Sequence, residues 1–275
     1  MTAAFLVCPL CAGPFDIQNG VWRCTAGHTF DVAREGYVNL LPAHHKHSKD
    51  PGDRPESLQA RRAFLDAGHY APLRAALVER LSALRPTGLL DIGCGEGYYT
   101  AAMAAQASTT VGLDIAKPAI RLAAKRHSGI TWVVGSGARL PVASESVDVI
   151  CTLFTPLHEA EMARVLRPGG RVLMVTPDAA HLHDLRAALF DVVEPHEPEK
   201  FRKGFEPLFE FVDQQAVRYP LALSPRDVNL LLEMTPYAWK ARPERRVELE
   251  AREAGLQTEA AFSMLEFTKT PAPAR

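Results

Sequence analysis

The sequence has little excess charge and no long hydrophobic run. It holds 31 lysines and arginines against 32 aspartates and glutamates, a formal net charge of −1, so overall charge does not indicate a nucleic-acid partner. No apolar stretch is long enough to span a bilayer. No internal repeat occurs, and the one biased stretch is the proline- and alanine-rich tail at residues 271–275. With 275 residues the chain can form one domain and a small module, and we expect a cytoplasmic protein with no membrane partner.

Cysteine is also scarce, and its distribution is uneven. Of the five cysteines, Cys8 and Cys11 form a C-x2-C pair near the start of the chain, and Cys24 forms a C-x3-H pair with His28. Twelve residues separate the two pairs, and four such ligands at this spacing suit tetrahedral zinc. The pattern therefore predicts an N-terminal zinc ribbon held by these four side chains.

The other interpretations of these cysteines are a redox pair and a disulfide. A redox C-x-x-C pair normally lies near a βαβ unit and opens a helix, whereas glycine and proline follow here at residues 13–14. Disulfides are disfavoured because the number of cysteines is odd and no signal peptide precedes them. Asn19-Gly20 is a hairpin signal, which favours the ribbon. Cys94 and Cys151 lie in later segments, where small core residues are the common role.

The most informative segment is the glycine-rich stretch at residues 91–100. An apolar pair leads into Asp91, Gly93, Gly95 and Gly97, and an alanine-rich helix follows. Glycine allows a sharp turn and a close approach of a nucleoside to the backbone, and the helix N-terminus offers free N–H groups. The order is G-x-G-x-G rather than the G-x-G-x-x-G of dinucleotide sites, and the leading acid suits a ligand with a cationic amino-acid tail, such as S-adenosylmethionine. An ordinary glycine-rich turn is the alternative for this segment taken alone.

The segments that follow alternate between strands and helices. Strands are predicted over residues 109–113, 131–134, 146–153 and 171–176, with a helix over 160–166 and a turn over 167–170. The first of these strands ends in Asp114, about twenty residues after the glycines, where an acid can accept both ribose hydroxyls. Residues 135–141 form a loop that can pass the adenine. This alternation predicts an α/β fold with a doubly wound, mostly parallel sheet, and the block resembles the class I, Rossmann-like methyltransferases with a seven-stranded sheet.

A polar segment of different character precedes this block. Residues 44–62 contain three histidines, five lysines and arginines, and three acids. Such a run is usually a solvated linker, and the alternative is a basic strap that contacts phosphate or closes over the active site. Helices are predicted over residues 56–67 and 70–84, the second packed on the sheet, with a break at Gly68-His69. The predicted domains are a zinc ribbon at 1–35, a linker with helices at 36–85 and a methyltransferase domain at 86–270.

RNA binding would require local basic surface, because the total charge is nearly neutral. The candidates are Lys46, Lys49, Arg54, Arg61, Arg62, Arg202, Lys203, Lys240, Arg242, Arg245 and Arg246. The last four follow Tyr237 and Trp239, on which an unpaired base could stack. The equally weighted alternative is that these two aromatic residues are core anchors.

Several stretches resemble the RlmA family, the zinc-containing 23S ribosomal RNA (guanine-N1)-methyltransferases. They are residues 35–42 (EGYVNLLP), 50–53 (DPGD), 60–70 (ARRAFLDAGHY), 91–100 (DIGCGEGYYT) and 234–239 (MTPYAW). The resemblance covers nearly the whole chain and implies cofactor contacts from Tyr70, Gly95, Glu96 and His181, with structural zinc in the ribbon. It also implies a homodimer, and methylation of N1 of one guanine in a hairpin loop of 23S ribosomal RNA. The chain is most similar to the Gram-negative-type branch, and we expect the ribbon and the strap to form a second surface beside the active site.

The resemblance has one departure, and it concerns the acceptor side. The family usually has Tyr-Ala-Pro after the central strand, whereas this chain has Phe154-Thr155-Pro156. No residue can be assigned as a general base, since His158, Glu159 and Glu161 are of a kind more often found at solvated helix starts.

Two rival functions are a small-molecule methyltransferase of the quinone or secondary-metabolite kind and a non-enzymatic zinc-ribbon binding module. The ribbon and the strap disfavour the first. The intact glycines and acids disfavour the second.

Overall fold

The structure, a computed structural model, describes residues 5–42, 52, 54–206 and 208–270. It begins with a small antiparallel sheet of β1 (Phe15–Gln18), β2 (Val21–Cys24) and β3 (Thr29–Asp31). Asn19 and Gly20 form the β1–β2 turn with φ angles of 51° and 76°, the left-handed pair that a two-residue hairpin requires. The predicted hairpin is confirmed.

The rest of the chain is organised around one large sheet with the strand order β10-β11-β9-β8-β5-β6-β7-β4. Its strands are β4 (Tyr37–Asn39), β5 (Gly88–Ile92), β6 (Thr109–Asp114), β7 (Thr131–Val134), β8 (Val147–Leu153), β9 (Leu166–Pro177), β10 (Phe209–Leu223) and β11 (Leu256–Lys269). The strands from β4 to β9 pair in parallel, while β10 and β11 are antiparallel. The predicted α/β fold with a mostly parallel sheet is confirmed.

Two details of the sheet differ from the sequence-based expectation. The described sheet has eight strands rather than seven, because the three-residue β4 pairs with β7 and is too short to give an alternating pattern. The turn predicted over residues 167–170 lies inside β9, which already pairs with β8 where Leu166 faces Val147. A register shift between Val147 and Val149 absorbs these residues.

Helices cover both faces of the sheet. They are α1 (Pro55–Asp66), α2 (Ala71–Leu84), α3 (Tyr98–Met103), η2 (Ala104–Gln106), α4 (Lys117–Arg126), α5 (Glu159–Val165), α6 (His183–Leu189), α7 (Glu199–Phe205), α8 (Pro225–Met234), α9 (Tyr237–Lys240) and α10 (Pro243–Glu250). Leu89 of β5 lies in one hydrophobic cluster with Leu77 of α2, and its neighbour Leu90 lies in another with Met162 of α5. Successive strand residues point to opposite faces, so a continuous apolar strand suits a sheet covered on both sides.

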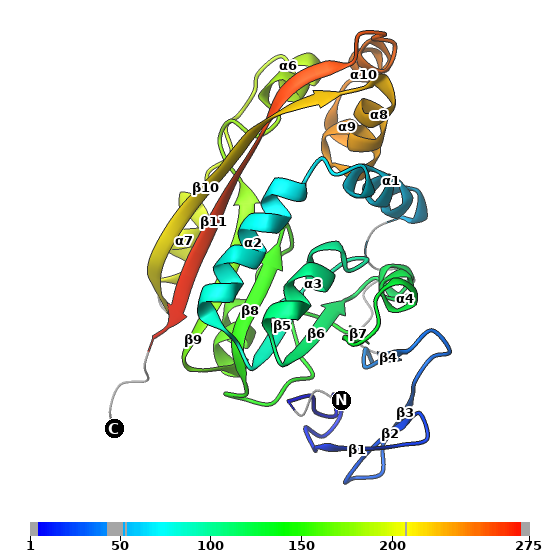
Figure 1. The fold of residues 1–275 in the computed structure, drawn as a ribbon, viewed down its shortest axis with the longest axis vertical. Helices are drawn as coiled ribbons and strands as arrows, with labels where there is room; N and C mark the ends of the chain where they lie inside the picture. The colour runs from blue at the N-terminus through cyan, green and yellow to red at the C-terminus, as the bar shows by residue number, and fades with distance from the viewer. Residues whose placement is uncertain (1–4, 43–51, 53, 207, 271–275) are drawn as a thin grey trace.

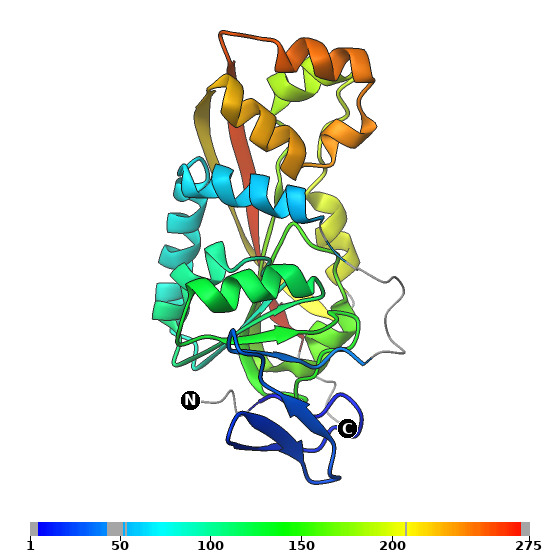
Figure 2. The same ribbon diagram turned by 90° about the vertical axis from the view of Figure 1, so that its right-hand side faces the viewer.

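A second helical layer lies beyond the sheet. The long antiparallel pair of β10 and β11 extends past the other strands, and α6 gathers at its far end with α8, α9 and α10, which connect the two strands (Figure 1). Helix α1 packs on α8 and crosses toward α4, where Leu58 contacts Ala116 and Ala119 (Figure 2). The break between α1 and α2 is at Gly68, whose φ is 88°, as predicted. None of the helices in the described ranges has the length and apolar character needed to cross a membrane.

Candidate functional site

The four predicted metal ligands meet at one point of the ribbon. The ligand atoms of Cys8, Cys11, Cys24 and His28 all lie within 4.8 Å of one another. The Cys11 and Cys24 Sγ atoms are 3.5 Å apart, and His28 Nδ1 lies 3.3 Å from Cys24 Sγ and 3.6 Å from Cys8 Sγ. A zinc tetrahedron with ordinary bond lengths has edges of about 3.8 Å between sulfurs and about 3.5 Å between sulfur and nitrogen. The donor set and its spacing therefore fit zinc.

The ribbon lies at the amino ends of the central strands. The Phe5 carbonyl accepts a 2.8 Å hydrogen bond from Ala143 N, and Leu6 forms a β-bridge with Val142. The Phe5 ring also packs against Gly88, the first residue of β5, 3.3 Å from where a Cβ would stand. The glycine-rich loop follows the other end of β5. The expectation that the ribbon and the strap form one surface beside the active site is therefore wrong for the ribbon.

The glycine-rich loop requires glycine for steric reasons. Gly93, Gly95 and Gly97 have φ angles of 75°, 57° and 85°, a region that disfavours other residues. A Cβ on Gly93 would lie 2.6 Å from the Thr155 hydroxyl, and one on Gly97 would lie 2.5 Å from the Trp132 ring. The first and third glycines are thus fixed by their neighbours as well as by their backbone angles.

The two predicted acids lie at the carboxyl ends of adjacent strands. Asp114 accepts hydrogen bonds from Gly95 N and Ala116 N, each 2.8 Å long. Asp91 is 2% exposed, and its Oδ2 accepts a 2.6 Å bond from the Thr100 hydroxyl. Its Oδ1 is buried without a hydrogen-bond partner among the described residues. Burial, with a smaller contribution from the Asp114 charge, raises the pKa of Asp91 to about 7. A buried carboxylate oxygen without a partner fits the cationic tail of S-adenosylmethionine.

A cavity of about 180 Å³ opens between these strand ends. Gly93, Asp114 and Thr155 line it, together with residues 135–137 at the start of the loop predicted to pass the adenine. His158 also lines it. Because parallel strands of a doubly wound sheet bind ligands outside their carboxyl ends, this cavity is the candidate cofactor site.

Glu161, one of the residues considered as a general base, is already hydrogen-bonded within the fold. It accepts a 2.7 Å bond from Arg164 Nε and another of 2.7 Å from Leu140 N. These bonds fix the loop between β7 and β8. Glu161 therefore has a structural role. Sequence reasoning missed Thr100 as a site residue, because only the packing of α3 brings its hydroxyl to Asp91. It named Thr155 in the loop after β8 but did not place it against Gly93, where the structure has it.

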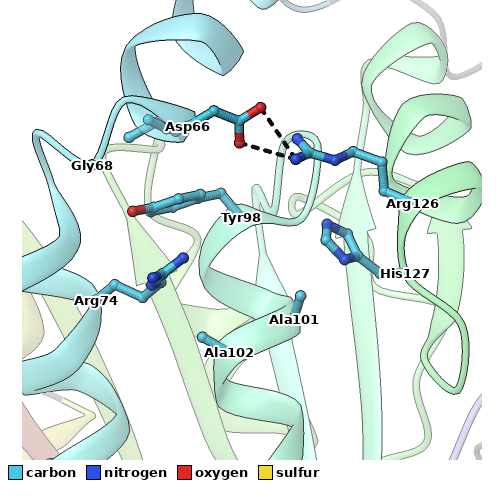
Figure 3. Close-up of a pocket in the computed structure, with 9 residues that line it drawn as sticks. Asp66, Gly68, Arg74, Tyr98, Ala101, Ala102, Arg126 and His127 are labelled. Atoms are coloured by element: carbon cyan, nitrogen blue, oxygen red, sulfur yellow. Dashed lines mark hydrogen bonds and ion pairs between the residues drawn. The ribbon is translucent and has the colours of Figure 1, made fainter.

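Glu96 does not line the cofactor cavity. Its side chain is buried, its Oε1 lies 3.8 Å from Arg126 Nη1, and burial raises the pKa of this carboxyl to about 7 against the lowering effect of Arg126. Arg126 also lines a second cavity of about 350 Å³ between α1, α2, α3 and α4. Figure 3 shows Arg126 reaching Asp66 across this cavity, with Arg74 beside the Tyr98 ring. The two cavities share no lining residue.

Tyr70 and His181 lie together in a buried aromatic cluster. Their rings are 5.0 Å and 4.5 Å from that of Phe262. His181 Nδ1 accepts a 3.2 Å hydrogen bond from Ala261 N, and burial lowers the pKa of His181 to about 3. The ring is therefore neutral, and its proton is on Nε2. Phe154 joins this cluster at 5.6 Å from Phe262, so the cluster borders the loop after β8, whose Thr155 and Pro156 line the candidate cofactor cavity.

The fold and the cavity together define an S-adenosylmethionine-dependent methyltransferase of the Rossmann-like class, with a zinc ribbon. The chain matches the family models described as RlmA, N-terminal, over residues 6–49 and as Methyltransferase domain over residues 90–174. A Streptomyces fradiae protein named 23S rRNA (guanine(748)-N(1))-methyltransferase is 36% identical over 87% of this chain and 88% of its own length. A Micromonospora griseorubida protein assigned as a 23S rRNA (guanine-N(1)-)-methyltransferase is 37% identical over 91% of both chains. The chain belongs to this RlmA family.

Among solved structures, the YcgJ protein of Bacillus subtilis superimposes with a TM-score of 0.51 at 18% identity, over 74% of this chain and 100% of that one. This likeness confirms the fold alone. S-adenosylmethionine is the methyl donor of the catalytic domain and zinc is the metal of the ribbon, as the sequence predicted. The family is confirmed, and the Gram-negative-type branch within it stays a prediction.

Proposed function

We propose that this chain transfers the methyl group of S-adenosylmethionine to N1 of one guanine in a hairpin loop of 23S ribosomal RNA. The observation that carries the proposal is near full-length similarity to relatives of that name, combined with a cavity at the carboxyl ends of β5 and β6. We further propose a cytoplasmic homodimer, as the family resemblance implies, with domains at residues 1–35, 36–85 and 86–270.

In this proposal the two acids and the glycine-rich loop hold the cofactor. S-adenosylmethionine supplies an electrophilic methyl group on its sulfonium. Asp114 accepts the ribose hydroxyls in addition to its backbone partners, because a carboxylate can accept about four hydrogen bonds. Asp91 faces the ammonium through its Oδ1, and Gly93 and Gly95 let the backbone approach the nucleoside. Holding both reactants in line supplies much of the acceleration in a methyl transfer.

The aromatic cluster forms the acceptor side. Phe154 is 47% exposed and can offer its ring to a base that has left its stack. The buried ring of Phe262 packs behind Phe154, and the buried ring of Tyr70 packs on Phe262. His181 can only donate from Nε2, because Nδ1 is occupied by Ala261 N. Its role is to donate to an oxygen of the substrate or the cofactor rather than to remove the proton from guanine N1. Glu96 holds the glycine-rich loop in place, because its buried side chain lies beside Arg126 of α4.

The RNA needs contacts outside the cavity. The strap provides them at its described end, where Gly52 packs against Ala116, two residues after Asp114, while Lys46 and Lys49 lie outside the described residues. The ribbon lies at the amino ends of the strands, opposite the cavity. We therefore propose that an RNA that contacts both the ribbon and the cavity lies along the β4 edge of the sheet.

Primer extension on 23S ribosomal RNA treated with the enzyme and S-adenosylmethionine tests the proposal. N1 methylation blocks Watson–Crick pairing and stops reverse transcription, so one enzyme-dependent stop next to a guanine is expected. A small-molecule extract serves as the competing substrate. Transfer of labelled methyl to the extract, with no stop in the RNA, would mean that the substrate assignment is wrong.

A further inference from the structure

The three tryptophans differ sharply in exposure. Trp22 is 5% exposed and Trp132 is 2% exposed, whereas Trp239 is 55% exposed. Two residues earlier, Tyr237 turns inward, and its hydroxyl lies 2.9 Å from His196 Nε2. Residues two apart on a helix point in nearly opposite directions, so anchoring Tyr237 holds Trp239 outward. Of the two aromatic residues, one is an anchor and the other is a surface residue.

A cation already lies on the exposed indole. The Arg54 guanidinium is 4.5 Å from the centre of the Trp239 ring. Arg54 immediately precedes α1, two residues after Gly52, whose backbone packs on Ala116 near Asp114. No carboxylate within ion-pair distance of Arg54 occurs in the part of the chain that the structure describes. Arg54 therefore brings a cation to the point where the strap meets α9.

The neighbouring cations are differently placed. Arg242 and Arg245 both pair with Asp191, at 3.0 Å and 3.3 Å, and Arg246 pairs with Glu233 and Glu250. These side chains form a partly neutralised surface rather than a broad basic patch. The pair of Arg54 and Trp239 thus combines an exposed ring with a cation that has no acid beside it among the described residues.

A continuous set of side-chain contacts joins this pair to the acceptor side. Tyr237 bonds to His196, whose ring is 6.3 Å from that of His181. His181 packs on Phe262, and Phe262 contacts Phe154 in the loop after β8. Helix α9 is therefore anchored on the same cluster that borders the candidate site, and Trp239 projects from its outer side.

We propose that Trp239, with Arg54 stacked on it, is a platform for an unpaired nucleobase that flanks the target guanine, with Arg54 also contacting the backbone phosphate. The proposal rests on the proposed function, since the base belongs to the substrate RNA. Unpaired bases in RNA loops are commonly bound by stacking on aromatic rings and on arginine planes. A protein partner would favour a contiguous apolar surface, whereas the cations Arg54 and Lys240 adjoin this single ring.

The experiment uses tryptophan fluorescence of the full-length enzyme with an unmodified 23S ribosomal RNA hairpin. Because the other two tryptophans are buried, stacking should quench the solvent-exposed component of the emission, and Trp239→Phe should remove that response. A fully paired RNA of equal length should quench less. Unchanged emission at saturating hairpin, or equal quenching by the duplex, would overturn the platform.

Methylation kinetics give the second readout. Trp239→Ala should raise KM for the hairpin by about tenfold, a typical effect for one stacked base. Trp239→Phe keeps an aromatic ring and should have a KM close to that of wild type. Arg54→Lys should raise KM, because an ammonium group does not stack on the ring as a guanidinium does. Val247→Ala, which shortens another exposed apolar side chain of the same layer, is the matched control and should leave KM unchanged. Calorimetry should show equal cofactor affinity in all variants. If Trp239→Ala methylates like wild type, the platform alone is wrong. If wild type neither binds nor methylates the hairpin, the proposed function fails as well.

Discussion

Asp114 offers the sharpest test of the candidate cofactor site. Its carboxylate accepts N–H groups from Gly95 in the glycine-rich loop and from Ala116 at the start of α4, each at 2.8 Å. Asp114→Ala therefore removes the proposed ribose acceptors and also leaves two backbone donors without this partner. The variant should lose both cofactor affinity and stability.

The magnitudes follow from the number of bonds. A hydrogen bond to a charged group contributes about 1.5–3 kcal/mol. Removing two bonds to ribose hydroxyls at the lower figure costs about 3 kcal/mol, which weakens cofactor binding by about a hundredfold. The absence of the two backbone bonds should lower the free energy of unfolding by about 2 kcal/mol, because water can reach the half-buried carboxylate position and replace part of each bond.

Calorimetry with S-adenosylhomocysteine and thermal unfolding measure the two effects separately. The matched control is Asp148→Ala. Asp148 likewise accepts a backbone N–H, that of Gly88 at 2.6 Å, and pairs with Arg167 at 2.7 Å, but it lies at the opposite end of β5. The control should lose stability and keep its cofactor affinity. Unchanged affinity in Asp114→Ala, or an equal loss in the control, would refute the placement of the ribose.

Three other changes should have distinct effects. Cys11→Ser should release zinc and loosen the ribbon while cofactor affinity stays near wild type, and equal zinc content in both proteins by atomic absorption would contradict this. The pKa of Asp91 is raised by burial from 3.8 to about 7, so the unfolded chain loses this proton at lower pH than the folded one, and the Asp91 contribution to stability falls as pH rises from about 4 to 7. Glu96, with its pKa also raised to about 7, acts in the same direction, and His181, with its pKa lowered to about 3, acts in the opposite direction. Relative to wild type, ligand-free Asp91→Asn should therefore gain stability in thermal unfolding as pH rises from about 4 to 7, and an unchanged difference between the two proteins would argue against the buried carboxylate. Changing Arg61 and Arg62 to Gln should weaken RNA binding and reduce the salt slope by about one for each phosphate that these arginines neutralise, and a slope equal to wild type would exclude phosphate binding by α1.

Local sequence determined the elements whose chemistry depends on spacing. The four zinc ligands lie on two short knuckles, and each knuckle fixes its own pair through a tight turn, so the pattern alone identified the ribbon. The glycine loop was equally readable, because positive φ angles exclude most other residues. Asp114 was predicted at the end of a strand from its spacing of about twenty residues after the glycines, and it is the last residue of β6. The strands over residues 131–134 and 146–153 were close to the observed β7 and β8, since buried strands are continuous apolar runs.

Only the tertiary structure decided how these parts are arranged. No sequence signal predicts the docking of Phe5 beside Gly88, which places the ribbon at the amino ends of the strands. Motif spacing could not show which of the implied cofactor residues lie at the cavity. In the structure Glu96 lies near Arg126, and His181 belongs to the aromatic cluster. It left Tyr237 and Trp239 equivalent, and a bond to His196, forty-one residues away, makes one an anchor and leaves the other exposed. Each of these outcomes depends on packing between segments distant in the chain, and neither periodicity nor motif spacing encodes which distant segment will fill a given space.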